Sequence, residues 1–253
     1  IIKEDFMGAY YAAIIKQGRN DWKMFIPWTC DNGAKLMEHS YYGKKFLMSV
    51  LKLLYNRKSR LVWLCDYHED ENFNWYTFPA PKWEPIKIKK PFCVVNHTKK
   101  ELYSFSGIVK SVLEKFESGN NDYIRFYVYR EGEIVLYIMD PLSLLTNSDP
   151  EAAGGGDFQE KYEYRGNWKK DLIEVLNETK KDKFLMELGY ADISEKLLAP
   201  LYDYFDLKNE KEKELQRKLY NELLKEYATP SQYRSLDKFD IRVQIIKGYL
   251  LKK

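Results

Sequence analysis

The residue pattern changes across Asp140–Asp157, and this change constrains the fold more than any other feature of the sequence. Before the segment, short apolar runs lie between turn residues. The alternation of Ile124, Phe126 and Val128 with their neighbours is typical of a half-buried antiparallel hairpin. After it, apolar stripes recur at helical spacing among many charged residues, most clearly over Lys208–Tyr227. The sequence therefore predicts an α+β fold: an antiparallel sheet with packed helices, followed by a mainly helical C-terminal part.

The length of 253 residues fits one large domain or two small ones. We place a boundary near Gly166, so that an α+β domain spans residues 1–166 and a helical region spans residues 167–253. The apolar stripes of the helical region need a surface to cover them, which predicts that this region packs on the first domain.

Periodicity and turn residues predict the individual elements. Strands are expected at Gly8–Ile15, Lys23–Thr29, Arg60–Tyr67, Phe92–Val95, Leu102–Phe105, Tyr123–Tyr129 and Ile134–Met139. Helices are expected at Ala34–Tyr55, Gly107–Glu117, Lys181–Gly189 and Asp192–Phe205. The segment Asp171–Leu176 fits either a helix or a strand.

Composition narrows the class of protein. The 41 basic and 38 acidic residues nearly balance, which disfavours nucleic acid as a partner. No apolar run is long enough to span a membrane and no signal-like segment opens the chain, so we expect a soluble, cytoplasmic protein. Aromatic residues reach 16%, an excess that fits strand-rich structure or a surface for a protein partner or self-association.

The three cysteines lack the spacing of a metal or redox motif. Cys65 and Cys93 fall inside apolar strand patterns, which is typical of buried, unreactive thiols. His39 falls inside a predicted helix and is interpreted as structural. The sequence thus predicts no metal site and identifies no cofactor.

A first group of candidate catalytic residues follows the strand expected at Arg60–Tyr67. Asp66 and His68 stand there among further carboxylates, where a general base or a divalent ion could be placed. A solvated acidic loop explains the same residues equally simply. The third candidate catalytic residue is His97, in a later turn.

That later turn is a candidate ligand-binding segment. Asn96, His97 and Lys99 lie between two expected strands, and such side chains could bind a phosphate or a carboxylate. The alternative is an ordinary polar hairpin turn.

Gly154, Gly155, Gly156 and Asp157 form a second candidate ligand-binding segment. Successive glycines let a backbone approach a ligand closely, but they also make a plain linker. The segment lacks the residues that a P-loop or a dinucleotide fingerprint requires. Whether it is a site or a linker stays open.

Four segments resemble, in order, motifs of a family of uncharacterised bacterial and phage-borne proteins: Val95–Tyr103, Pro141–Thr146, Gly154–Phe158 and Gly166–Trp168. The resemblance covers about residues 90 to 175, and it implies a bacterial or phage origin but no activity. It also favours a natural loop at the glycines. The sequence departs from the pattern after Trp168, where the family has a small residue and glycine, so the resemblance gives Asp171 no role.

Two functions fit these observations. The leading hypothesis is a binding or interaction module whose recognition surface combines the His97 turn with the Gly154–Asp157 loop. The alternative is an enzyme that acts on a phosphorylated or nucleotide-like substrate through Asp66, His68, His97 and Asp157. The enzyme requires these four side chains to converge in one pocket.

Overall fold

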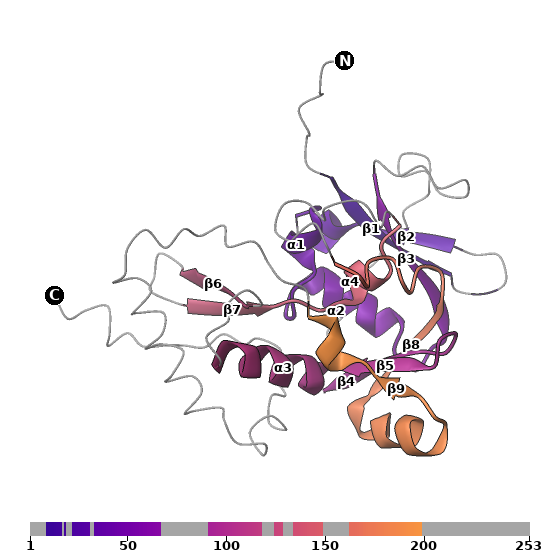
Figure 1. The fold of residues 1–253 in the computed structure, drawn as a ribbon. Coiled ribbons are helices and arrows are strands. Elements are labelled where there is room, and N and C mark those ends of the chain that lie inside the picture. The colour runs from indigo at the N-terminus through magenta and orange to yellow at the C-terminus, as the bar shows by residue number, and fades with distance from the viewer. Residues whose placement is uncertain are drawn as a thin grey trace.

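The computed structural model of the chain describes residues 9–16, 18, 22–30, 33–66, 91–117, 124–128, 134–148 and 162–198 (Figure 1). These residues form a seven-stranded mixed sheet, a separate two-stranded sheet and several helices, which confirms the α+β class. The helix predicted over Lys208–Tyr227 and most of the predicted helical part lie outside them. Within them, no helix has the length and apolar character that crossing a membrane demands.

The large sheet has the strand order β2-β1-β3-β8-β4-β5-β9. Its strands are β1 (Tyr11–Lys16), β2 (Trp22–Phe25), β3 (Ser59–Cys65), β4 (Phe92–Asn96), β5 (Glu101–Ser104), β8 (Leu172–Asn177) and β9 (Ala191–Asp192). Every neighbouring pair is antiparallel except β5 with β9, so the sheet is mixed and not wholly antiparallel as predicted. The small sheet pairs β6 (Ile124–Val128) with β7 (Ile134–Ile138). The antiparallel pair predicted around Ile124, Phe126 and Val128 is present. The two strands predicted on either side of the Asn96–Lys99 turn also pair.

Strand β8 lies between β3 and β4, although it follows the predicted boundary at Gly166. The segment Asp171–Leu176, which fitted either a helix or a strand, is therefore a central strand from Leu172 onwards. β9 likewise pairs with β5. Residues 172–192 thus contribute to the same sheet as residues before Gly166, and the division of the chain into two regions stays a prediction.

Two short helices, α1 (Leu36–His39) and α2 (Lys45–Leu53), stand where one helix was predicted over Ala34–Tyr55. Gly43 has a φ of 84°, in the left-handed region that ends a right-handed helix. The prediction of one helix was wrong because both helices bury apolar residues in the same core, so the apolar spacing continues across the break.

The remaining helices are α3 (Phe105–Glu117), α4 (Leu142–Leu145), the 3₁₀ turns η1 (Pro27–Cys30), η2 (Glu178–Lys180) and η4 (Ser194–Leu197), and the π-helical turn η3 (Lys183–Glu187). The helix α3 confirms the prediction at Gly107–Glu117, and η3 lies within the predicted Lys181–Gly189. The helix predicted from Asp192 is wrong at its start, because only η4 is helical and Leu198 has extended backbone.

Both faces of the sheet carry buried apolar side chains. One face packs with α2, α3 and α4 around the main core, to which Leu61, Trp63 and Cys65 of β3 contribute. On the other face, Val62 and Leu64 are buried with residues of β1 and β2. Strands buried on both sides read as continuous apolar runs, which explains why β3 and β4 were recognisable in the sequence.

His39 is a buried core residue. Its Nε2 accepts a hydrogen bond from Nε1 of Trp63 at 3.0 Å, which places the ring proton on Nδ1, 3.2 Å from the carbonyl oxygen of Gly33. Burial lowers the pKa of His39 to about 3, so the imidazole is neutral in the folded protein. The structural role predicted for His39 is confirmed.

Candidate functional site

The turn between β4 and β5 is shaped from within by Asn96. The Oδ1 atom of Asn96 accepts hydrogen bonds from the backbone N–H groups of Thr98 at 2.9 Å and Lys99 at 3.1 Å. Its Nδ2 donates to Oδ2 of Asp171 at 2.8 Å. Because Asn96 is fully buried and bonded at both ends of its amide, it orders the turn and ties it to the start of β8. Asp171, which the resemblance left without a role, acquires a structural one.

His97 joins three parts of the chain. Its Nε2 lies 2.9 Å from Oε2 of Glu174 in β8, and its Nδ1 lies 2.9 Å from the hydroxyl oxygen of Tyr190. With Glu174 ionised, every atom is satisfied when Nε2–H donates to the carboxylate and the Tyr190 hydroxyl donates to Nδ1. Burial lowers the pKa of His97, although the bond to Glu174 opposes this shift. The imidazole is therefore a neutral bridge at pH 7.

Lys99 and its neighbours connect the turn to the segment before β8. The ammonium of Lys99 bonds to the side-chain oxygen of Asn167. The indole N–H of Trp168 donates to Oε2 of Glu101 at 2.8 Å. The backbone N–H of Trp168 donates to the carbonyl oxygen of Leu145 at 2.7 Å.

One motif segment, Gly166–Trp168, therefore contacts two of the others, Val95–Tyr103 and Pro141–Thr146. The Tyr103 hydroxyl adds a bond to Oδ1 of the buried Asp140 at 2.7 Å. Burial raises the pKa of Asp140 to about 6. The fourth segment, with Gly154, Gly155, Gly156 and Asp157, lies outside the described residues.

Asp66 and His97 lie near opposite ends of the sheet. Strands β3 and β4 are both antiparallel to β8, so they run in the same direction, and Ser59 and Asn96 both pair with Ile173. Asp66 follows the far end of β3, roughly 23 Å from Ser59 at about 3.3 Å per residue. There its carboxylate accepts a hydrogen bond from the backbone N–H of Tyr10 at 2.8 Å.

The structure thus does not bring together the two described members of the predicted acid–base group, Asp66 and His97. The other two, His68 and Asp157, lie outside the part of the chain that the structure describes. The sequence pattern could not show this separation, because it depends on which strand β8 pairs with at each of its edges.

One row of side chains crosses the sheet at its His97 end. Lys16 in β1 is opposite Trp22 in β2 on one side and Arg60 in β3 on the other. Arg60 is in turn opposite Leu172 in β8. The backbone N–H of His97 donates to the carbonyl oxygen of Leu172. Since side chains alternate along a strand and Ile15, Leu61 and Ile173 point into the main core, Lys16, Arg60 and Leu172 point to the opposite face. We call these five residues the cross-strand row: Trp22, Lys16, Arg60, Leu172 and His97.

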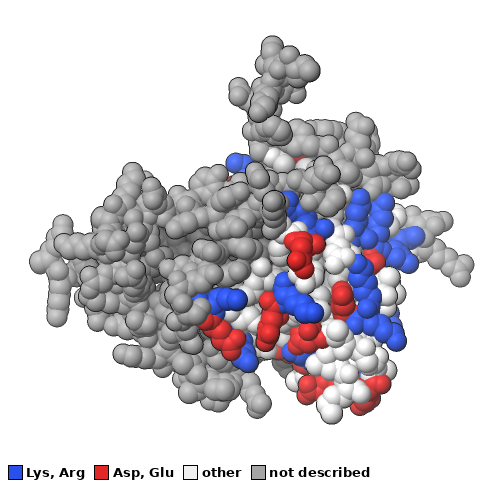
Figure 2. Space-filling view, in the orientation of Figure 1, with Lys and Arg blue, Asp and Glu red and all other residues white. Residues whose placement is uncertain are grey.

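Further basic residues flank the cross-strand row. Arg57, Lys58, Lys99 and Lys100 are exposed, as is Arg60 within the row. The charge of Lys58 is close enough to lower the pKa of His97. Figure 2 shows Lys and Arg side chains gathered along this side of the molecule. The guanidinium of Arg60 donates a hydrogen bond to the backbone carbonyl oxygen of Lys170 at 2.7 Å. The carboxylates of the same region also bond to protein groups: Asp171 to Asn96, Glu174 to His97 and Glu101 to Trp168.

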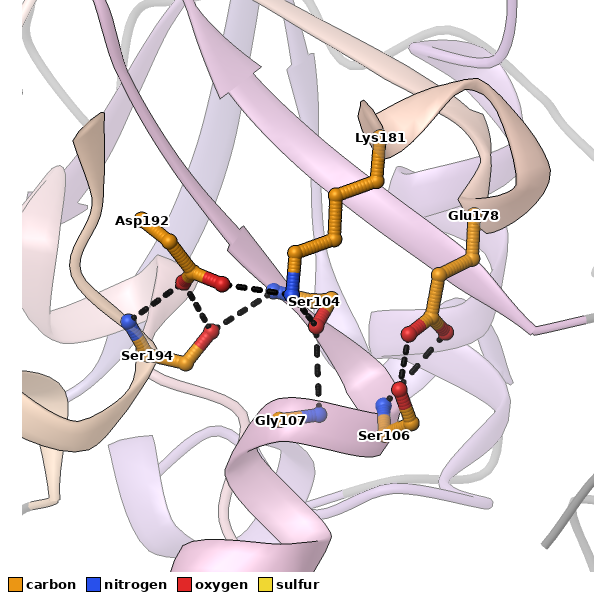
Figure 3. A network of polar contacts seen from close by, with 7 residues as sticks. All are labelled: Ser104, Ser106, Gly107, Glu178, Lys181, Asp192 and Ser194. Carbon is orange, nitrogen blue, oxygen red and sulfur yellow. Dashed lines mark hydrogen bonds and ion pairs between the residues drawn. The ribbon is translucent and has the colours of Figure 1, made fainter. Parts of the chain in front are cut away.

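Sequence reasoning missed a second polar cluster, at the junction of β5 and α3 (Figure 3). The hydroxyl oxygen of the buried Ser104 accepts from the backbone N–H of Gly107 at 3.1 Å, as a helix N-cap does. A Cβ atom on Gly107 would lie 2.6 Å from Oγ and 2.8 Å from Cβ of Ser194, so the close approach requires glycine. A serine three residues before a helical glycine was the available signal, but it is a common pattern.

The rest of this cluster comes from residues after β8 (Figure 3). Lys181 pairs with Oδ2 of Asp192 at 2.5 Å and donates to Oγ of Ser104 at 3.1 Å. Glu178 accepts bonds from the hydroxyl and the backbone N–H of Ser106, at the positive end of α3. Burial raises the pKa of Glu178. Burial alone would raise the pKa of Asp192, but its bonds from Lys181 and Ser194 lower it. The cluster fastens residues 178–194 to α3.

The described residues were compared with the requirements of a metal site and of a reactive thiol. Among them, no three His, Cys, Asp or Glu side chains are arranged to hold a metal ion. Cys30, Cys65 and Cys93 are buried and form no disulfide, which confirms that the thiols of Cys65 and Cys93 are buried, and burial raises the pKa of Cys93 to about 12.

Comparison of the chain with protein-family models, with curated proteins and with solved structures finds no match. The resemblance of its four segments to the bacterial and phage-borne family accordingly stays a prediction.

Proposed function

We propose that this chain is a binding or interaction module of bacterial or phage origin, and that its recognition surface lies at the His97 end of the sheet. The observation that supports this most is the gathering of basic side chains from separate chain segments around the cross-strand row: Lys16, Arg57, Lys58, Arg60, Lys99 and Lys100. Each comes from a strand end or turn that the sheet places at the same level. The Gly154–Asp157 loop belongs to the proposal through the family resemblance alone.

The chemistry of this surface favours an anionic partner. Neighbouring cations lower the energy of a carboxylate or phosphate placed among them. One terminal nitrogen of the Arg60 guanidinium donates to the carbonyl oxygen of Lys170, and the remaining N–H groups can bind either anion. Asn96 and the N–H groups of the turn are already bonded to one another, so the partner meets exposed Lys and Arg side chains and not the turn backbone.

The alternative function is an enzyme acting on a phosphorylated or nucleotide-like substrate through His97 without Asp66, because the sheet separates these two residues. The contact that favours it is the bond from His97 to Glu174, because a carboxylate that orients an imidazole is a recurrent arrangement in general-base catalysis. For a substrate to reach Nδ1 of His97, the hydroxyl of Tyr190 has to move away, since it occupies that nitrogen.

Affinity capture tests the binding proposal directly. The whole chain and a Lys58→Glu/Arg60→Glu variant are immobilised and exposed to the same bacterial lysate. A Lys180→Glu/Lys196→Glu variant makes the same charge change at exposed positions away from the cross-strand row and serves as the control. We expect the first variant to capture at least about tenfold less protein than the natural chain, equivalent to about 1.4 kcal/mol of binding free energy. The control variant should capture the same amount as the natural chain. An identical captured set for all three chains overturns the proposal.

A further inference from the structure

We infer that the partner of this surface is an extended, acidic segment of another protein that also carries a large apolar side chain. The inference rests on the proposed function, because it assigns a partner class to the same surface. It draws on the apolar residues beside the basic ones, which the binding proposal does not use.

The first support is the position of the η3 segment. Phe184, Leu185 and Tyr190 pack on the sheet face opposite the main core, against Val95, Leu102 and their neighbours in β4, β5 and β8. Tyr190 then bonds to His97, the last residue of the cross-strand row. The η3 segment therefore stands on the same face as the row and adjoins one end of it.

The second support is the apolar surface that this segment presents. Met186 is 85% exposed and Leu188 is 45% exposed, while Phe184 and Leu185, which directly precede Met186, are partly buried. The chain turns back at Gly189, whose φ is 67°. Methionine is flexible and polarisable and suits a surface that accommodates another chain. An apolar projection next to a basic row is a combination that a purely ionic ligand would not use.

The third support is the composition of the cross-strand row itself. The apolar Trp22 and Leu172 are partly exposed and flank Lys16 and Arg60 in the row. Tryptophan and arginine are the residues most enriched among protein–protein hot spots. A single-stranded nucleic acid instead needs open aromatic faces for stacking, and the ammonium of Lys16 already lies 5.7 Å from the ring centre of Trp22.

The dimensions indicate the length of the partner segment. From β2 to β4 the row crosses neighbouring strands that are each about 4.8 Å apart, so it extends over roughly 19 Å. An extended peptide of about six residues has that length. Acidic side chains on such a segment can face Lys16 and Arg60 while an apolar one reaches Met186 or Leu188.

Fluorescence anisotropy with defined probes tests the partner class. The probes are a labelled peptide that alternates Glu and Leu over about six residues, the same peptide with Ser in place of Leu, and a thymidine oligonucleotide of equal length. We expect the Glu–Leu peptide to bind the whole chain most tightly, with weakening of at least about fivefold for either other probe. Lys58→Glu/Arg60→Glu and Met186→Asp should each weaken it, whereas Lys180→Glu/Lys196→Glu should not.

The outcomes separate the inference from the proposed function. Absence of Glu–Leu peptide binding at about 1 mM, or tighter binding of the oligonucleotide, overturns the inference. If the lysate capture still depends on Lys58 and Arg60 in that case, the proposed function stands without this partner class. If both measurements are insensitive to Lys58 and Arg60, both proposals fail. Met186 is exposed, so its substitution leaves the fold intact, and thermal melting of each variant verifies this.

Discussion

The β5–α3 junction and the cross-strand row use polar residues in opposite ways. At the junction, Ser104 is buried and Lys181 is bonded to Ser104 and Asp192, so each polar group has a protein partner. In the row, Arg60 and the adjacent Lys58 are exposed, although the guanidinium of Arg60 donates to the backbone carbonyl oxygen of Lys170. The first region stabilises the fold, because satisfied buried polar groups contribute to stability. The exposed charges of the second region contribute little to stability, and they are the charges that we propose for recognition. Substitutions in the two regions should therefore have separable effects.

The largest effect on stability is expected from the buried titratable groups when the pH changes. The pKa of His39 is about 3 in the folded protein, below its ordinary value of 6.5, so acidification between these values destabilises the fold. The pKa of Asp140 is about 6, above its ordinary value of 3.8, so acidification between these values has the opposite effect. From pH 6 to 4 the two contributions oppose each other in the natural chain.

Asp140→Asn removes one of these opposing contributions. Between pH 6 and 4, the free energy of unfolding of the variant should therefore fall by about 1.4 kcal/mol more per pH unit than that of the natural chain. Urea unfolding measures both values. Asparagine retains an oxygen for the bonds from Tyr103 and the N–H of Leu142. Parallel pH profiles for the variant and the natural chain would show that Asp140 is not a buried acid of raised pKa.

Gly107→Ala should give the next largest effect. Alanine in a helix is ordinarily better than glycine by about 0.8–1 kcal/mol. Here its methyl group would meet Ser194 at 2.6–2.8 Å, and overpacking of this kind costs about 1–3 kcal/mol. Urea unfolding should therefore show a net loss of stability. A gain in stability would mean that α3 and η4 do not approach as closely as described.

Lys181→Met should have a smaller effect, of about 1 kcal/mol, because the side chains of Lys181 and Asp192 are 21% and 29% exposed and solvent screens their attraction. A double-mutant cycle with Asp192→Asn isolates the pair. A coupling energy near zero would indicate that this ion pair does not fasten β9 to the junction.

The smallest effect on stability is expected at the row. Lys58→Glu/Arg60→Glu should change the free energy of unfolding by no more than about 0.5 kcal/mol, since both side chains are exposed. Urea unfolding checks this. A loss comparable to that of Gly107→Ala would place these residues among the groups that hold the sheet together and would end the contrast between the two regions.

Local patterns explain which elements could be predicted. The hairpin of β4 and β5 was predictable because Asn96 and the residues after it carry the chemistry of a turn. The position of β8 in the middle of the sheet was not, because nothing near Leu172 encodes its partners in β3 and β4. The break at Gly43 could not be predicted, because apolar residues continue at helical spacing on both sides of it.

The candidate site was predictable only in part, for the same reason. The His97 turn could be singled out from its residue types, whereas Lys16 and Arg60 acquire meaning only through the register that sets them level with Leu172. Asp66 and His97 were both candidate acid–base residues. They are far apart because β3 and β4 run in the same direction, and the start of β3 is level with the end of β4. Long-range pairing decides these relations, and a single sequence does not specify it.

The most direct test of the account is the affinity of the Lys58→Glu/Arg60→Glu variant for the Glu–Leu peptide, measured by anisotropy on protein whose unfolding free energy matches that of the natural chain. We expect the variant to bind the peptide at least about tenfold more weakly, or by about 1.4 kcal/mol, and added salt to weaken binding to the natural chain. Equal affinity of the two chains for the peptide would contradict the claim that the His97 end of the sheet is a recognition surface for an acidic partner.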